Sequence, residues 1–239
     1  MSLDQTEVSH LLEKLDAVST ELDQIKAMLL QPEQRRHSVM CTSELSSLSH
    51  SFIVMPEQLR CVSTRLNCNH ESMIESSSIL YRATIDGWSA SIFHSLCDDL
   101  THLLVLFKLI DGSICGAFTG DMATFTGKEH KPAPNSFLFS ISNPHGMAPF
   151  VLDEAGVESS PEVAGVNADP LLGPSYGIGD LICMLESRTL GTSKLGMTFW
   201  NYSKGVFDQQ NVMPDSHSSR TLLCRPNTNL AEIEVYILK

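Results

Sequence analysis

The sequence predicts a mainly β fold of the α+β class: a two-sheet antiparallel β-sandwich with short edge helices, preceded by a coiled-coil helix. Three observations lead to this prediction. Short apolar segments recur along most of the 239-residue chain, separated by stretches rich in Gly, Pro, Asn and Ser. The strands are not separated by helices of crossover length, which disfavours a parallel α/β sheet. An apolar heptad pattern occupies the first 31 residues.

The N-terminal segment, residues 1–31, has apolar residues at alternating spacings of three and four. These residues are Val8, Leu11, Leu15, Val18, Leu22, Ile25 and Leu29. This heptad spacing predicts a coiled coil through which the chain self-associates. An amphipathic helix packed on its own domain is the alternative, although such a helix usually has a wider apolar stripe. Pro32 is expected to end the helix.

The polar, Ser-rich residues 32–50 are predicted to be a linker, and residues 51–239 are predicted to form a globular domain with its own core. Within the linker, Arg35-Arg36-His37-Ser38 resembles the site preferred by basophilic kinases. Phosphorylation of Ser38 would add charge to a flexible segment. An ordinary solvated linker is the alternative.

Three segments of the globular domain are predicted to be helical. Phe52–Leu66 and Met73–Leu80 have mixed apolar spacing, so short helices are expected there. Ser89–Leu100 has a clearer pattern, and Ser89 is placed as an N-cap. The apolar face of this helix comprises Ile92, Phe93, Leu96, Cys97 and Leu100.

A β-hairpin is the best local signal in the chain. Leu103–Ile110 and Ser113–Thr119 are its two strands, and Asp111-Gly112 suits a two-residue turn that accepts positive φ. Further strands are predicted at Ser136–Ser142, Leu181–Glu186, Gly196–Tyr202 and Ala231–Leu238. In the last of these, apolar residues alternate with Glu and Tyr, as is typical of a strand.

The composition excludes several classes of protein. Acidic residues outnumber Lys and Arg 28 to 16, giving a formal net charge of −12. Nucleic acid is not an expected partner, because phosphate binding needs clustered Lys and Arg. The longest apolar run, Leu103–Ile110, is too short to span a membrane. The N-terminus lacks the features of a secretory signal, so a cytoplasmic protein is expected.

One long stretch carries much of the negative charge. No Lys or Arg occurs between Lys131 and Arg188. This interval contains the candidate partner-docking residues Asp153, Glu154, Glu158 and Glu162. An acidic face of this kind would steer a basic partner. A solvated loop that serves solubility is the alternative.

The cysteines and histidines do not have metal-site spacing. Cys61, Cys68 and His70 form C-x6-C-x-H, whereas zinc ligands usually pair two to four residues apart. We therefore expect no metal and no other cofactor. A thiol-based redox sensor is an alternative function, with Cys41 in the linker as the exposed thiol. Three cysteines in apolar stretches are expected to be inert: Cys97, Cys115 and Cys183.

A serine hydrolase is a second alternative. Gly173–Gly177 matches the G-x-S-x-G nucleophile motif around Ser175, and Asp208 or Asp215 and then His217 follow in the order of α/β-hydrolases. The flanking sequence lacks the strand and helix that this motif needs. A Gly-rich turn is the favoured interpretation, and no catalytic residue is assigned.

His94 and Asp98 are one helical turn apart within the predicted Ser89–Leu100 helix. This spacing allows the two side chains to pair on the polar face. No nucleophile accompanies them, so we predict a surface ion pair rather than a catalytic dyad.

Five motifs, in order, resemble those of the TLDc domain family. Residues 80–98 read LYRATIDGWSASIFHSLCD, and the family reads roughly LYRASRDGFSASDFHSKCD. The other four are a hairpin ending in a Gly-aromatic-Thr element at 104–119, an N-x-F-L-F-S-L-x-N-P strand at 135–144, a glycine loop at 176–180 and a closing strand at 232–236. The resemblance covers most of residues 75–239.

The resemblance implies a two-sheet antiparallel β-sandwich and a non-enzymatic role. Proteins of this family protect cells from oxidative stress, and several bind the vacuolar proton-pumping ATPase. Subunits of this ATPase are therefore the partners that the resemblance implies. The chain departs from the family in its loops, since the glycine loop lacks one Gly and its His. These departures affect functions carried by loops more than the fold.

Overall fold

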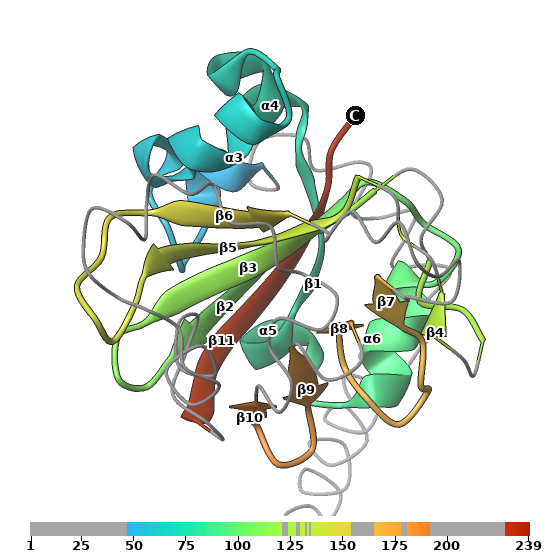
Figure 1. The fold of residues 1–239 in the computed structure, drawn as a ribbon. Coiled ribbons are helices and arrows are strands. Elements are labelled where there is room, and N and C mark those ends of the chain that lie inside the picture. Colours follow the sequence, from blue (N-terminus) through green and yellow to red (C-terminus); the bar gives the residue numbers. More distant parts are fainter. Residues whose placement is uncertain are drawn as a thin grey trace, which may run out of the picture. The chain divides into compact units, whose positions relative to one another are not determined.

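An antiparallel sheet of eight strands runs through the domain. The computed structural model describes residues 47–120, 124–127, 130–131, 133, 135–153, 165–177, 181–191 and 228–239 (Figure 1). The helices are η1 (Leu48–His50), η2 (Pro56–Leu59), α3 (Arg60–Arg65), α4 (His70–Ser76), α5 (Ala83–Asp86) and α6 (Ala90–Cys97). The strands are β1 (Ser78–Arg82), β2 (Leu103–Leu109), β3 (Ile114–Thr119), β4 (His130–Lys131), β5 (Phe137–Ser142), β6 (Phe150–Asp153), β7 (Val166–Asn167), β8 (Ser175–Tyr176), β9 (Ile182–Met184), β10 (Thr189–Gly191) and β11 (Thr228–Ile237).

The strand β11 lies in the middle of the large sheet, although it comes last in the sequence. The strand order is β6-β5-β3-β2-β11-β10-β9, and β1 also pairs with β11. On one side of β11, β2 pairs with residues 230–237. On the other side, β1 pairs with residues 234–237 and β10 with residues 228–229. A second, three-stranded sheet has the order β4-β7-β8.

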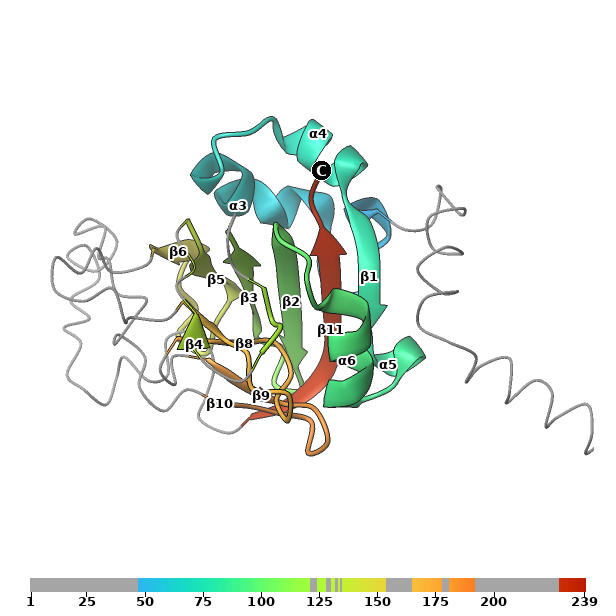
Figure 2. The same cartoon turned by 90° about the vertical axis from the view of Figure 1, so that its right-hand side faces the viewer.

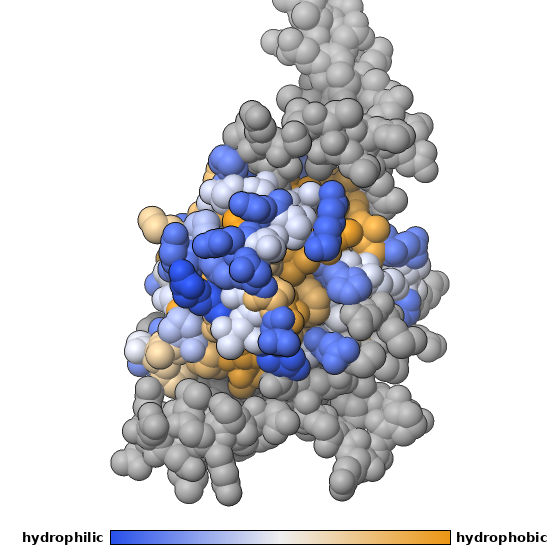
Figure 3. Space-filling view, turned by 90° about the horizontal axis from the view of Figure 1, so that it is seen from above, coloured by the Kyte–Doolittle hydropathy of each residue, from blue (hydrophilic) through white to orange (hydrophobic). Residues whose placement is uncertain are grey.

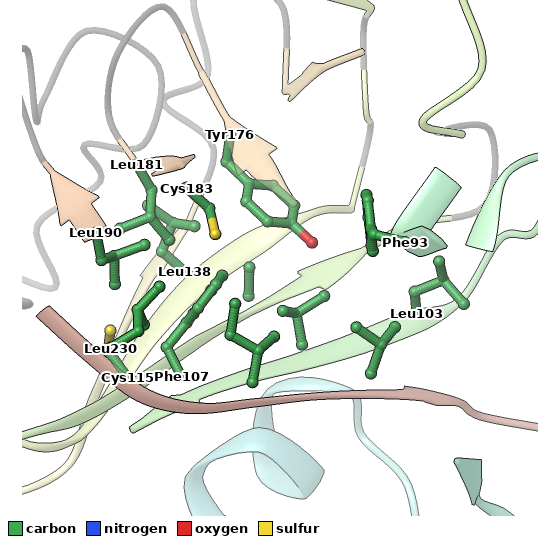
Figure 4. Packing of buried hydrophobic residues seen from close by; sticks show 14 of the residues in the cluster. Phe93, Leu103, Phe107, Cys115, Leu138, Tyr176, Leu181, Cys183, Leu190 and Leu230 are labelled. Atoms are coloured by element: carbon green, nitrogen blue, oxygen red, sulfur yellow. The ribbon is translucent and has the colours of Figure 1, made fainter. Parts of the chain in front are cut away.

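Both faces of the large sheet are buried, and β2 shows why. Leu104 and Leu106 contribute to an apolar cluster with residues of η2, α3 and α4. Val105 and Phe107 point to the opposite face and pack in a second cluster with residues of α6, the small sheet and the β9–β10 hairpin. Figure 4 shows Phe107 between the sheet and the layer that carries Tyr176. Because both of its faces are buried, β2 has an almost uninterrupted run of apolar residues in the sequence.

The predicted fold class is confirmed, because the strands pair in antiparallel fashion in two sheets and the helices are short. Figure 2 shows α5 and α6 beside β1 and β11. The predicted hairpin is confirmed as β2 and β3. Its loop is one residue longer than predicted and spans Ile110, Asp111 and Gly112. Leu109 N donates to Ser113 O at 2.9 Å, and Gly112 has a positive φ of 87°, as in a three-residue loop with a bulge.

The helix predicted at Met73–Leu80 is wrong in its second half. The helix α4 ends at Ser76, and Ser78–Arg82 is the strand β1, which pairs with the distant β11. The strands predicted near residues 136, 181 and 231 are found as β5, β9 and β11. The strand predicted at 196–202 and the coiled coil of residues 1–31 lie outside the described residues.

The described surface carries apolar residues that are separated from one another in sequence. The large exposed ones are Phe52, Met55, Ile85, Ile110, Leu171 and Met184. In the view from above, hydrophilic residues cover much of the described surface, with smaller hydrophobic areas between them (Figure 3). Singly exposed apolar residues are normal on folded domains and do not by themselves mark an interface. Among the described helices, none is long and apolar enough to cross a membrane.

The strand β3 contains a glycine whose missing side chain is required by packing. A Cβ atom at Gly116 would lie 2.3 Å from both the Val105 carbonyl oxygen and Phe139 Cζ. We therefore expect Gly116→Ala to lower the free energy of unfolding by about 3 kcal/mol, at the upper end of the range for overpacked cores. Urea unfolding at constant pH would measure this.

Gly146→Ala is the matched control, because a Cβ there would meet nothing within 4 Å. Its φ of 65° limits the expected cost to about 1 kcal/mol. Equal destabilisation of the two variants would contradict the steric argument.

Candidate functional site

Ser175 has a structural position that does not suit a nucleophile. It belongs to the two-residue strand β8 and is fully buried. Its hydroxyl donates to Gly173 O at 3.0 Å and accepts from Cys183 N at 2.9 Å. The bond from Cys183 joins β8 to β9, the bond to Gly173 closes the turn before β8, and the hydroxyl is thus engaged with backbone groups on both sides. The other members of the proposed triad, Asp208, Asp215 and His217, lie outside the described residues, and the hydrolase alternative is not favoured.

Three of the described thiols have a raised pKa, the opposite of what a redox sensor needs. Cys97, Cys115 and Cys183 are buried, as predicted, and burial raises the pKa of the Cys183 thiol. Burial also raises the pKa of Cys61 and of the exposed Cys68. A raised pKa lowers the thiolate fraction, which is the reactive form. Cys41 lies outside the described residues.

Cys68 and His70 are engaged with Ser63. The Cys68 thiol contacts Ser63 O at 3.7 Å, and His70 Nδ1 lies 3.1 Å from Ser63 Oγ. Within the part of the chain that the structure describes, no group of three His, Cys, Asp or Glu side chains is arranged to hold a metal ion.

The motif at residues 80–98 folds into β1, α5 and α6, and hydrogen bonds between its own residues hold these elements together. The Tyr81 hydroxyl donates to Gly87 O at 2.8 Å, and the Asp86 carboxylate accepts from Arg82 N at 2.8 Å. Gly87 has a φ of 108°, a conformation that favours glycine. These bonds fix the bend between β1 and α6.

The N-terminus of α6 is capped from a distant hairpin. Ser89 is the N-cap residue, as predicted, but its side chain makes no capping hydrogen bond. Instead Glu186 Oε1, from the β9–β10 turn, accepts from Ala90 N at 3.1 Å. Beside it, the Arg188 guanidinium lies 5.0 Å from the centre of the Trp88 ring. The sequence did not predict these two contacts, because the residues that they join are almost a hundred positions apart.

A buried ion pair joins β1 to β11. Arg82 Nε and Nη2 each lie 2.8 Å from Glu234 Oε1, and the Glu234 side chain is fully buried. Phe52 N donates to the same oxygen at 2.9 Å. The other carboxylate oxygen accepts from Ser51 Oγ at 2.5 Å and from the Tyr236 hydroxyl at 3.0 Å. Burial raises the pKa of the Tyr236 phenol, which therefore keeps the proton that it donates.

The same ion pair holds the segment before η2 on the sheet. Arg82 Nη2 donates to His50 O at 3.2 Å, and the Phe52 ring lies 3.8 Å from the guanidinium carbon. Nearby, Glu232 accepts bonds from the backbone N–H and the hydroxyl of Thr84 in α5. The charged residues of the first motif (residues 80–98) and the last motif (residues 232–236) therefore hold β1, α5 and β11 together.

His94 and Asp98 contact each other as predicted, but both side chains are less exposed than expected of a surface pair. His94 Nδ1 lies 2.7 Å from Asp98 Oδ1, and the side chains are 11% and 26% exposed. On the other edge of the ring, Nε2 lies 3.1 Å from Leu172 O and 3.3 Å from Asp169 O. The histidine thus connects α6 to a loop about 75 residues away in the sequence, a contact that sequence spacing did not predict.

The predicted docking and oligomerisation residues fall almost entirely outside the described residues. Asp153 is the last residue of β6, and its backbone pairs with Phe137 of β5. Glu154, Glu158 and Glu162 follow it outside the described part, as do the seven apolar residues of the heptad pattern. In the strand order, β6 is the end strand of the large sheet, so the acidic stretch starts at the sheet edge.

We expect Glu234→Gln to lower the free energy of unfolding by about 3–5 kcal/mol, because it leaves the buried Arg82 charge without its partner. Glu57→Gln is the matched control, since Glu57 is exposed on η2, and its expected effect is within about 0.5 kcal/mol. Thermal and urea unfolding would measure both. A cost for Glu234→Gln as small as that of the control would contradict the structural role of the ion pair.

Comparison with known proteins agrees with this architecture. A family model described as the TLDc domain matches residues 48–239, a range that contains β1, β11 and the Arg82–Glu234 ion pair. A search of curated proteins finds no match. Because the family model covers most of the sequence, the chain belongs to the TLDc domain family.

Proposed function

We propose that the chain is a non-enzymatic TLDc interaction protein that takes part in protection against oxidative stress. Its specific action would be to dock on the vacuolar proton-pumping ATPase and regulate it. The observation that supports this proposal is the match of the TLDc family over residues 48–239. The family is linked to oxidative stress, and the pump is a partner of several of its members, as the motif resemblance implies.

The chemistry of the described residues favours binding over catalysis. The nucleophilic or acidic side chains that could be considered as catalytic residues make structural contacts instead. Ser175 bonds to the backbone of β9, Glu234 pairs with Arg82, and Glu186 bonds to the start of α6. A protein whose buried charges hold a rigid scaffold can present loops to a partner in a fixed geometry.

The acidic stretch supplies a candidate docking surface. It begins at Asp153, where β6 ends at the edge of the large sheet. Together with Glu154, Glu158 and Glu162 it concentrates negative charge in ten residues of sequence. Such a surface would increase the rate of encounter with a basic partner, most strongly at low salt.

The heptad segment would add avidity. If residues 1–31 join two chains, one partner contact raises the effective concentration of the second domain at a neighbouring site. This contribution requires that both domains reach their sites together. It is separate from the docking surface and can be tested separately.

Affinity purification of the full chain from cell lysate at low salt tests the specific partner. We expect subunits of the vacuolar ATPase to co-purify and their recovery to fall several-fold when Asp153, Glu154, Glu158 and Glu162 are changed together to amides. The control variant neutralises the exposed Glu57, Glu71 and Glu75 on η2 and α4. Absence of pump subunits would refute the partner, and equal losses in both variants would refute the docking surface.

Light scattering of the purified full chain tests self-association. We expect an oligomer that becomes a monomer when Leu15 and Leu22 of the heptad pattern are both changed to Glu, because the charges would face each other at the seam. Leu12→Glu, outside the pattern, should leave the mass unchanged. A monomeric wild type, or an unchanged mass in the Leu15/Leu22 variant, would defeat the coiled-coil prediction.

A further inference from the structure

The side chain of His94 links α6 to the loop before β8. The backbone carbonyls of Asp169 and Leu172 both face Nε2 of His94, at 3.3 Å and 3.1 Å. Nδ1 of the same ring faces Asp98, at 2.7 Å. The imidazole therefore lies between an acidic side chain on its own helix and two carbonyl oxygens of residues 169–172.

All of these partners are acceptors. A carbonyl oxygen cannot donate, and neither can an ionised carboxylate. A neutral imidazole carries one N–H and can therefore satisfy only one of its two edges, whereas the imidazolium carries two and satisfies both. In the neutral ring, one nitrogen lone pair would face an oxygen lone pair at about the same distance.

We propose that protonated His94 is a latch that holds the loop of residues 169–172 against α6, and that loss of the proton releases this loop. Asp98 is the charged side chain that pairs with the ring among the described residues. The Asp169 carboxylate, from the loop itself, accepts from Leu171 N at 2.9 Å. Asp99, next to Asp98, is bonded to Thr126.

The direction of the effect follows from the bonds. When the ring loses a proton, the charge-assisted bond to the Asp98 carboxylate favours Nδ1 as the site of the remaining one. Nε2 then turns a lone pair toward the two carbonyls, and the loop contact is lost. The contact between the ring and the loop is therefore expected to depend on pH.

The release would be confined to the surface. At the end of the loop, Gly173 N donates to Cys183 O at 2.8 Å, and a Cβ at Gly173 would lie 2.9 Å from Cys183 Sγ. This close packing fixes the chain where it enters β8. The loop itself displays Leu171, which is 77% exposed, so the latch controls the order of an exposed apolar side chain without opening the core.

Hydrogen–deuterium exchange of the full chain tests the latch at the amides of Leu171 and Leu172. After correction for intrinsic rates, we expect their exchange to rise about tenfold from pH 5 to pH 8, the change expected for loss of one charge-assisted hydrogen bond. In His94→Gln, which has no charge to lose, exchange should be independent of pH. His145→Gln, at an exposed turn, should behave as the wild type.

Two results would overturn the proposal: exchange in the wild type that does not change with pH, or an equal pH dependence in His94→Gln. Nitrogen-15 NMR of the wild-type imidazole gives a second measurement that needs no variant. It should show both ring nitrogens protonated over the pH range in which the loop amides are protected. Protection that continues unchanged after the ring has lost its proton would equally reject the latch.

Discussion

The buried ion pair between Arg82 and Glu234 is the interaction on which the arrangement of the domain depends. A carboxylate without partners in the middle of a sheet would be costly, so its position is acceptable only when each oxygen is satisfied. Here the partners come from β1, from β11 itself and from the segment at residues 51–52. A buried pair of this kind contributes little net stability relative to an apolar core, and we infer that its main effect is to fix how the segments that supply it are placed.

The parts of the fold that sequence reasoning predicted are those with local signals. The β2–β3 hairpin has two apolar strands and an Asp-Gly turn, and both strands are found, but Val105 pairs with Ala117, one residue away from the register that a two-residue turn would give. The helix α6 has an apolar face at helical spacing and begins where expected. Residues 78–80 continue an apolar pattern that is compatible with a helix, yet they form a strand because β11 offers them backbone partners. Long-range pairing overrides local preference at such a position.

At the candidate sites too, contacts within one element could be predicted from the sequence, whereas contacts between distant segments could not. The spacing of His94 and Asp98 predicted their contact, since both belong to one helix. The carbonyls of Asp169 and Leu172, the Glu186 cap and the Ser51–Glu234 bond join residues that are far apart in sequence. No periodicity or motif spacing could reveal them. The motifs at residues 80–98 and 232–236 can be recognised by their resemblance to a family. The hydrogen-bond network that joins them depends on the pairing of β1 with β11, which the sequence does not reveal.

The central position of β11 has a consequence for how the protein is made. A ribosome releases β1, β2 and β3 long before residues 228–237 exist, so for most of synthesis β1 and β2 lack the strand that both pair with. The sheet can close only when this last strand inserts between them, a contact across more than a hundred residues, and such non-local pairing slows folding. The nascent chain would thus expose two incomplete strand edges, which are surfaces that chaperones protect. A premature stop upstream of residue 228 would remove a strand with which β1, β2 and β10 all pair.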